Sequence, residues 1–218
     1  MIWSKGTGNK CVMKKYVLGV ALLWAFAGPA GAEQPIKEGA PEMNLEKATF
    51  AAGCFWCTQS TFDKIKGVRS TRAGYTGGHV KDPTYEQVCS GTTGHAEAIE
   101  VIYDSGEVTY QKLLDAFWRA INPTQKNQQF FDKGEQYRTV IFYHNDEQKR
   151  LAEASRQALA DSGKFSKPIV TEIAPVTEFY PAEDYHQQYY KKSPMRYQMY
   201  NAASGRAEYR KEVWGEGK

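Results

Sequence analysis

Two cysteines, Cys54 and Cys57, stand three residues apart directly after a glycine, in the segment GCFWC. A short apolar run, KATFAA, precedes them and a helix-forming stretch follows, so the pair is expected at the start of a helix. The positive end of a helix favours an anion, and the thiolate is the reactive form of cysteine. Three residues correspond to about 300° of helix rotation, which places both sulfurs on one face. One thiolate can therefore react while the other resolves the product.

The C-x-x-C spacing taken alone is compatible with other functions. C-x-x-C is also half of a zinc site, which needs two further ligands. Candidate ligands occur along the chain without a second paired spacing; they are Cys89, His79, His95, His144 and His186. Two buried structural cysteines and a general disulfide oxidoreductase are the remaining alternatives. Because a strand and a glycine precede the pair, we favour redox chemistry and expect no metal site.

Several further segments resemble one known family, in the family's order along the chain. They are GCFW, GYTGG, PTY, VCSG, TGHAE, QYR and EDYHQQY, and the resemblance extends over about residues 47–194. It is a resemblance to the A-type peptide methionine sulfoxide reductases. It implies an enzyme that reduces the S epimer of methionine sulfoxide, free or in oxidised proteins, with thiols.

The resemblance also implies a role for each matching position. The implied roles are nucleophile for Cys54, proton donor for Glu97, methyl pocket for Phe55 and Trp56, contacts to the sulfoxide oxygen for Tyr85 and Tyr137, and acidic pocket residue for Asp132. Elementary chemistry agrees, because a sulfoxide oxygen is a poor leaving group until it is protonated. A carboxyl in a partly apolar pocket has a raised pKa and can donate that proton near neutral pH.

Position 57 departs from many members of that family, which have glycine there and place resolving cysteines in a C-terminal tail. The tail of this chain, residues 193–218, contains no cysteine. We therefore expect a sulfenic acid on Cys54 to condense with Cys57, and a thioredoxin-like dithiol, rather than a prosthetic cofactor, to reduce the resulting disulfide. The tail is expected either to wrap the surface or to be mobile, without a catalytic part, and Cys89 is expected to be buried and structural.

Hydrophobic periodicity predicts the elements that position these residues. Strands are predicted at 47–52, 68–75, 95–103, 136–143 and 169–173, and helices at 54–65, 109–121, 145–162 and 182–192. The first six elements follow the order of a ferredoxin-like βαββαβ core. We expect an α+β fold, a two-layer α/β sandwich with long loops at 76–94 and 122–135 and an extended C-terminal segment.

The N-terminal segment has the pattern of a targeting signal. Three lysines precede an uncharged run at 16–27, and Ala30-Gly31-Ala32 follows as a small-x-small cleavage site. The run is shorter than the roughly 18–20 apolar residues of a membrane span, although an uncleaved anchor is the alternative. We predict a signal peptide at 1–32, cleavage near Ala32, and export to the periplasm. A linker at 33–46 and a catalytic domain at 47–192 would follow.

Composition narrows the function classes further. The chain has 218 residues, 41% hydrophobic and 24% charged, as is ordinary for a single soluble domain. The first 32 residues contain four lysines and no acidic residue. Without them, the 28 basic residues are reduced to 24, against 25 acidic residues, so the formal net charge is −1. That balance offers no case for nucleic-acid binding. Three remaining cysteines do not form a paired disulfide scaffold, and we expect a monomer.

Overall fold

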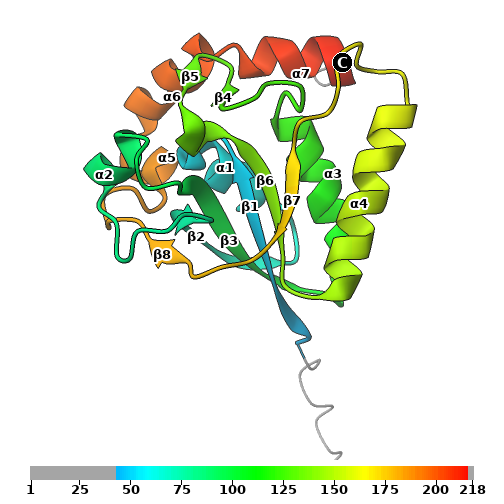
Figure 1. The fold of residues 1–218 in the computed structure, drawn as a ribbon, viewed down its shortest axis with the longest axis horizontal. Helices are drawn as coiled ribbons and strands as arrows, with labels where there is room; N and C mark the ends of the chain where they lie inside the picture. The colour runs from blue at the N-terminus through cyan, green and yellow to red at the C-terminus, as the bar shows by residue number, and fades with distance from the viewer. Residues whose placement is uncertain (1–42, 216–218) are drawn as a thin grey trace, which may run out of the picture. The chain divides into compact units, whose positions relative to one another are not determined.

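A computed structural model describes residues 43–215, and a six-stranded sheet lies at its centre (Figure 1). The strands follow the spatial order β7-β6-β1-β3-β2-β8. Their bounds are β1 Leu45–Ala52, β2 Val68–Thr76, β3 Ala96–Asp104, β6 Thr139–Tyr143, β7 Glu172–Pro175 and β8 Tyr180–Pro181. Neighbouring strands are antiparallel except β6 and β7, which are parallel. The order β6-β1-β3-β2 is that of a ferredoxin-like unit, so the predicted fold class is confirmed.

Helices cover one face of this sheet and a single crossing segment covers the other. The helices on the first face are α1 Phe55–Phe62, α3 Tyr110–Ala120 and α4 Asp146–Asp161. On the second face, the chain between β7 and β8 runs across the sheet (Figure 1) and packs Val176 and Phe179 toward Ala98 and Phe142. The result is the two-layer sandwich expected from the order of the elements.

Shorter elements connect the sheet to its loops and form the C-terminal part. They are α2 Tyr85–Cys89, β4 Gln128–Gln129, β5 Asp132–Lys133, the 3-10 helix Glu135–Tyr137, α5 Tyr189–Lys192, α6 Pro194–Ala203 and α7 Arg206–Trp214. The two long loops predicted from the sequence therefore contain structure. In the first, the Thr84 hydroxyl accepts from the backbone of Gln87, and the Gln87 side chain accepts from the Thr84 N–H. This capping box fixes the start of α2.

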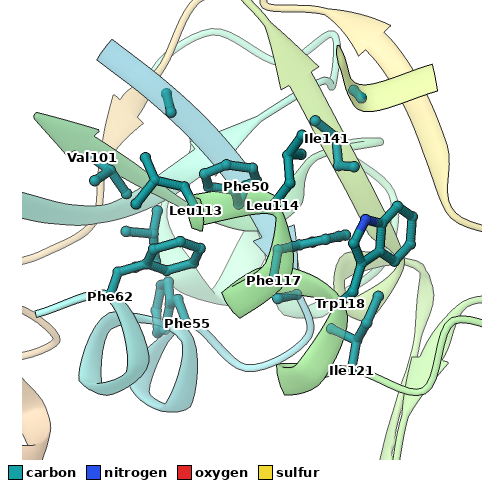
Figure 2. Packing of buried hydrophobic residues seen from close by; sticks show 14 of the residues in the cluster. Phe50, Phe55, Phe62, Val101, Leu113, Leu114, Phe117, Trp118, Ile121 and Ile141 are labelled. Carbon is teal, nitrogen blue, oxygen red and sulfur yellow. The ribbon is translucent and has the colours of Figure 1, made fainter. Parts of the chain in front are cut away.

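The main core forms where α1 and α3 meet β1 (Figure 2). Phe50 of β1 is fully buried and its ring lies 4.9 Å from that of Phe62 and 5.5 Å from that of Phe117. Side chains alternate along a strand, so Phe50 faces the helices while Ala51 faces the opposite layer. The apolar face predicted for the helix at 109–121 is buried throughout, in Leu113, Leu114, Phe117, Trp118 and Ile121.

Removing one of these rings should destabilise the fold strongly. Phe117→Ala leaves a cavity beside Phe50 and Trp118, and a buried Phe→Ala change costs about 3–5 kcal/mol. Urea unfolding followed by tryptophan fluorescence measures the loss. The matched control is Gln111→Ala on the exposed side of the same helix, which should change the free energy of unfolding by less than about 0.5 kcal/mol. A loss below about 1 kcal/mol for Phe117→Ala would contradict the packing.

Three sequence-based boundaries at the N-terminal and C-terminal ends are wrong. β1 begins at Leu45, inside the stretch predicted as linker. The helix predicted at 182–192 is confined to α5, because Gln188 adopts a left-handed conformation with φ of 51°. The tail predicted to wrap the surface forms α6 and α7, in the same compact unit as the sheet.

The predicted signal peptide and most of the predicted linker lie outside the described residues. From 43 to 215, none of the helices combines the length and the apolar character that a membrane span requires. The strand predicted at 136–143 is replaced at its start by a 3-10 turn, and the strand predicted at 169–173 lies three residues later.

Candidate active site

Cys54 occupies the turn between β1 and α1. Gly53 has φ of 78°, and a Cβ there would lie 2.6 Å from Cβ of Gln129, so this tight turn requires glycine. The Cys54 carbonyl accepts the N–H groups of Cys57 and Thr58, each at 3.2 Å, and thereby starts the helix. Both sulfurs are buried and unbridged, with 6% of Cys54 and 7% of Cys57 exposed. The pair therefore stands at a helix start, as predicted.

The electrostatics of the pair differ from the sequence-based expectation. Burial raises the pKa of Cys54, and the hydrogen bond and charge of Cys57 raise it further. The hydrogen bond from Cys54 lowers the pKa of Cys57, and Arg206 and Tyr197 lower it against the effect of burial. The helix start alone was expected to favour the Cys54 thiolate. The helix start therefore does not by itself lower the pKa of Cys54.

Glu97 of β3 lies beside the nucleophile. Its Oε2 accepts the backbone N–H of Phe55, the residue after Cys54, at 2.9 Å, and only 2% of Glu97 is exposed. Burial raises the pKa of Glu97 well above its ordinary range, the charge of Cys54 adds to this, and the Phe55 N–H acts in the opposite direction. Burial thus favours the protonated form of Glu97, and the carboxyl is held against the cysteine turn, as a proton donor requires.

The charge of Glu97 acts on two buried phenols, those of Tyr85 and Tyr137. Burial raises the pKa of Tyr85, with contributions from a hydrogen bond to Cys89 and from the charge of Glu97. Burial also raises the pKa of Tyr137, followed by the charges of Glu97 and Tyr85. Both phenols stay neutral and can donate hydrogen bonds. The prediction that Cys89 is buried is wrong, since its side chain is exposed beside Tyr85 at the end of the short helix α2.

Phe55 and Trp56 form an aromatic wall next to the pair. Nε1 of Trp56 donates to Nδ1 of His186 at 3.0 Å, so His186 is the structural hydrogen-bonder predicted from the sequence. Tyr189 stacks on the indole with ring centroids 3.9 Å apart, and the ring of Phe55 lies 4.9 Å from His186. The wall is therefore held from α1 and from the segment around α5, and the position of the indole is fixed.

Asp132 lies close to the cysteine pair, and side chains of the C-terminal tail bind its carboxylate. Its Oδ2 accepts the Tyr200 hydroxyl at 2.6 Å and lies 3.1 Å from Nη2 of Arg206. Arg206 is itself buried, with 5% exposed. Sequence reasoning placed Asp132 in the substrate pocket. Its charge acts to raise the pKa of Glu97 and of Tyr137 as well as that of Cys57, so Asp132 lies near both the substrate side and the tail that it anchors.

Four side chains that the sequence reasoning missed come from this tail: Tyr197, Tyr200, Asn201 and Arg206. The Cys57 thiol donates to Oδ1 of Asn201 at 3.6 Å. Tyr197, Tyr200 and Asn201 are spaced as i, i+3 and i+4, which places them on one face of a helix. That spacing is the signal that could have identified this face of α6.

Breaking the Asp132–Arg206 pair should cost stability. Asp132→Asn leaves a buried guanidinium without its counter-ion, a change worth about 3–5 kcal/mol when one partner of a buried pair is removed. The expected result is a lower free energy of unfolding in urea. The double variant Asp132→Asn with Arg206→Met removes both charges and should recover part of the loss. A single variant as stable as the unchanged protein would show that water screens this pair.

The described part of the chain contains no group of three or more histidine, cysteine, aspartate or glutamate side chains arranged to hold a metal ion. The groups available for chemistry at this site are a buried thiol pair, a buried carboxyl with a raised pKa and two neutral phenols. Together with the ferredoxin-like sheet, this arrangement is that of a thiol-dependent oxidoreductase.

Comparison with known proteins identifies the family. Residues 46–218 match the family model of peptide methionine sulfoxide reductase. The chain is 54% identical to the MsrA proteins of Listeria monocytogenes, over 171 residues, and Bacillus subtilis, over 170; each match covers 78% of this chain, and 97% and 96% of the relatives. The chain belongs to the peptide methionine sulfoxide reductase family, A type, and reduces methionine sulfoxide with thiols.

Solved structures share the fold. Mxr1 from Saccharomyces cerevisiae in its reduced form matches with a TM-score of 0.66 and 33% identity, over 69% of this chain and 87% of that one. Methionine sulfoxide reductase A of Corynebacterium diphtheriae matches with a TM-score of 0.63 and 36% identity, over 72% and 77%. The overall fold is therefore shared with two solved methionine sulfoxide reductases.

Proposed function

We propose that Cys54 attacks the sulfur of methionine S-sulfoxide while Glu97 protonates its oxygen. The contact between Glu97 and the N–H of Phe55, at 2.9 Å, carries this proposal, because it holds a buried carboxyl against the residue that follows the nucleophile. Tyr85 and Tyr137 would hydrogen-bond the same oxygen. The thiol and the sulfoxide become a sulfenic acid and a thioether, so the oxygen passes to Cys54 and methionine leaves.

The second half of the reaction uses Cys57. Its thiol attacks the sulfenic acid on Cys54, a disulfide forms and water leaves. Cys54 is the residue that caps α1 and Cys57 lies in its first turn, so the reaction needs only a local adjustment. A thioredoxin-like dithiol then reduces the disulfide by exchange and becomes oxidised itself. The substrates would be oxidised proteins, which the enzyme repairs after oxidative stress, and free methionine sulfoxide.

The aromatic wall supports the substrate assignment. The methyl group of methionine sulfoxide is small and apolar, and Phe55 and the half-buried Trp56 offer it an apolar surface next to Cys54. The indole is held by His186 and Tyr189, so the surface is fixed before the substrate arrives. A fixed wall on one side and proton donors on the other would distinguish the two sulfoxide epimers.

The test is reduction of the separate S and R epimers of dabsyl-methionine sulfoxide with dithiothreitol as reductant. We expect the S epimer to be consumed and Cys54→Ser to abolish the reaction, while Cys89→Ser retains it. Insulin disulfide reduction is assayed in parallel. Activity only on insulin would favour a general disulfide oxidoreductase and overturn the proposal.

We also propose that the protein is exported and processed near Ala32, acting in the periplasm. The lysines, apolar run and small-x-small site of the first 32 residues support this. Intact mass of the protein recovered from the periplasmic fraction of an expressing bacterium should match a chain that begins at Glu33. Full-length protein confined to the cytoplasm would contradict the proposal.

A further inference from the structure

A cavity reaches Cys57 from the side of the C-terminal helices. Its volume is about 100 Å³, and its wall consists of Ala52, Cys57, Thr58, Ser60, Thr61, Lys64, Ala120, Tyr197, Asn201, Arg206 and Arg210. None of the residues assigned to the sulfoxide lies on this wall. The cavity is therefore separate from the substrate side, and it has room for several water molecules or a small organic molecule.

The wall of this cavity is cationic. Lys64, Arg206 and Arg210 line it together with hydroxyl and amide groups, and the wall contains no carboxylate. Asp132 binds Nη2 of Arg206, and Asp115, which lies 3.0 Å from Nε of Arg119, lines a neighbouring cavity that Arg210 also lines. A small anion would find charge complementarity here.

Arg206 supplies an independent sign of a ligand. Only 6% of its side chain is exposed, yet Nη1 has no hydrogen-bond partner among the described residues. A buried cationic donor left unpaired is costly, and a bound anion would satisfy it. Nη2 of the guanidinium binds Asp132 and its central carbon lies 4.7 Å from the centroid of the Phe130 ring, which leaves Nη1 as the donor without a partner among the described residues.

Only one of the two sulfurs is accessible to a ligand bound in this cavity. Cys57 lies on the cavity wall and Cys54 does not, so a reagent that enters the cavity meets Cys57. In a Cys54–Cys57 disulfide, attack on Cys57 from this side would release Cys54. The cavity thus leads to the sulfur whose attack regenerates the nucleophile, and leaves the substrate side unobstructed.

We propose that the cavity admits small thiols that carry a carboxylate and directs them to Cys57, beside the protein dithiol route. This rests on the proposed function, because it requires the Cys54–Cys57 disulfide. The entering thiolate bonds to Cys57, the bond between Cys57 and Cys54 breaks, and Cys54 leaves as a thiolate. A second thiolate attacks the entered sulfur, so that Cys57 is freed and two small thiols leave as one disulfide.

The experiment first oxidises the protein with one equivalent of methionine sulfoxide and maps the disulfide by mass spectrometry. Reduction is then followed by tryptophan fluorescence with mercaptoacetate, 2-mercaptoethanol and cysteamine at constant ionic strength. Rates are compared per thiolate, corrected for thiol basicity. We expect mercaptoacetate to react about tenfold faster than cysteamine, the lower end of the effect of a charged cleft on association.

Matched variants separate the cavity from general surface charge. Lys64→Gln and Arg210→Gln remove wall cations and should each reduce the preference for mercaptoacetate about threefold. Lys66→Gln makes the same charge change two residues away, off the wall, and should leave the preference unchanged. Inorganic sulfate should compete with mercaptoacetate in the unchanged protein more than in Arg210→Gln.

Two failures are distinguishable. A disulfide that maps outside Cys54 and Cys57 overturns the proposed recycling step and this inference with it. A disulfide that maps to the pair and yet is reduced without preference for the anionic thiol overturns the cavity's role alone. A preference that both Lys64→Gln and Arg210→Gln leave intact has the same meaning. Trapping of the mixed disulfide on Cys54 rather than Cys57 has the same consequence.

Discussion

Glu97→Gln should lower kcat/KM for methionine sulfoxide by about 10²–10⁴-fold, the contribution expected of a positioned general acid. Glutamine keeps the size of the side chain, and its carbonyl can still accept the N–H of Phe55, so the turn at Cys54 should persist. The amide cannot protonate the departing oxygen. Initial rates of methionine formation, with circular dichroism to verify folding, measure the effect.

The pH dependence of activity and stability gives this prediction a second readout. Burial raises the pKa of Glu97, so the carboxyl is a proton donor below that raised pKa and activity falls as pH rises through it. The folded state holds this proton more tightly than the unfolded state. The free energy of unfolding therefore decreases with rising pH between the ordinary and the raised pKa. Glu97→Gln should remove both dependences.

Glu153 provides the matched control for Glu97. Glu153→Gln changes the same functional group on the exposed side of α4 and should leave both profiles as they are. If Glu97→Gln retains more than about a tenth of the unchanged kcat/KM, the proton reaches the oxygen from another donor. Tyr85 and Tyr137, the phenols on which the charge of Glu97 acts, would then be the groups to replace.

Local sequence patterns predicted the elements that carry the reaction. Period-two alternation located β3 and with it Glu97, and the apolar periodicity of α3 located the core under Cys54. Gly53 marked the turn, since its positive φ leaves little choice of residue. These features depend on short stretches of chain, so the sequence encodes them directly.

The tail could not be predicted in the same way. Arg206 is charged and was assigned to the surface, but it is buried because Asp132, 74 residues earlier in the chain, pairs with it. Burial also reverses the expected pKa direction for Cys54, and the neighbouring thiol adds to this effect. A helix terminus is visible in the sequence. The tertiary packing that removes water from Cys54 is not.

Cys57→Ser should separate the two halves of the reaction. The first turnover should still yield about one methionine per enzyme, because attack and protonation need only Cys54 and Glu97. The product then has no neighbouring thiol to resolve it, so the sulfenic acid should accumulate and react with dimedone on Cys54. Multiple turnover with a thioredoxin-like donor should fall by about 10²-fold or more, as an intramolecular step becomes a bimolecular one.

The exposed third cysteine decides between a local and a distant resolving thiol. Cys89 lies beside Tyr85 at the end of α2, and its accessibility makes it the competing candidate. Cys89→Ser should leave turnover unchanged, and Cys57→Ser with Cys89→Ser should match Cys57→Ser alone. If Cys57→Ser keeps its multiple-turnover rate and loses it only when Cys89 is also replaced, then Cys89 is the resolving thiol. Because Cys57 lies in the first turn of α1, which directly follows its capping residue Cys54, while Cys89 belongs to α2, we expect the local pair to account for turnover.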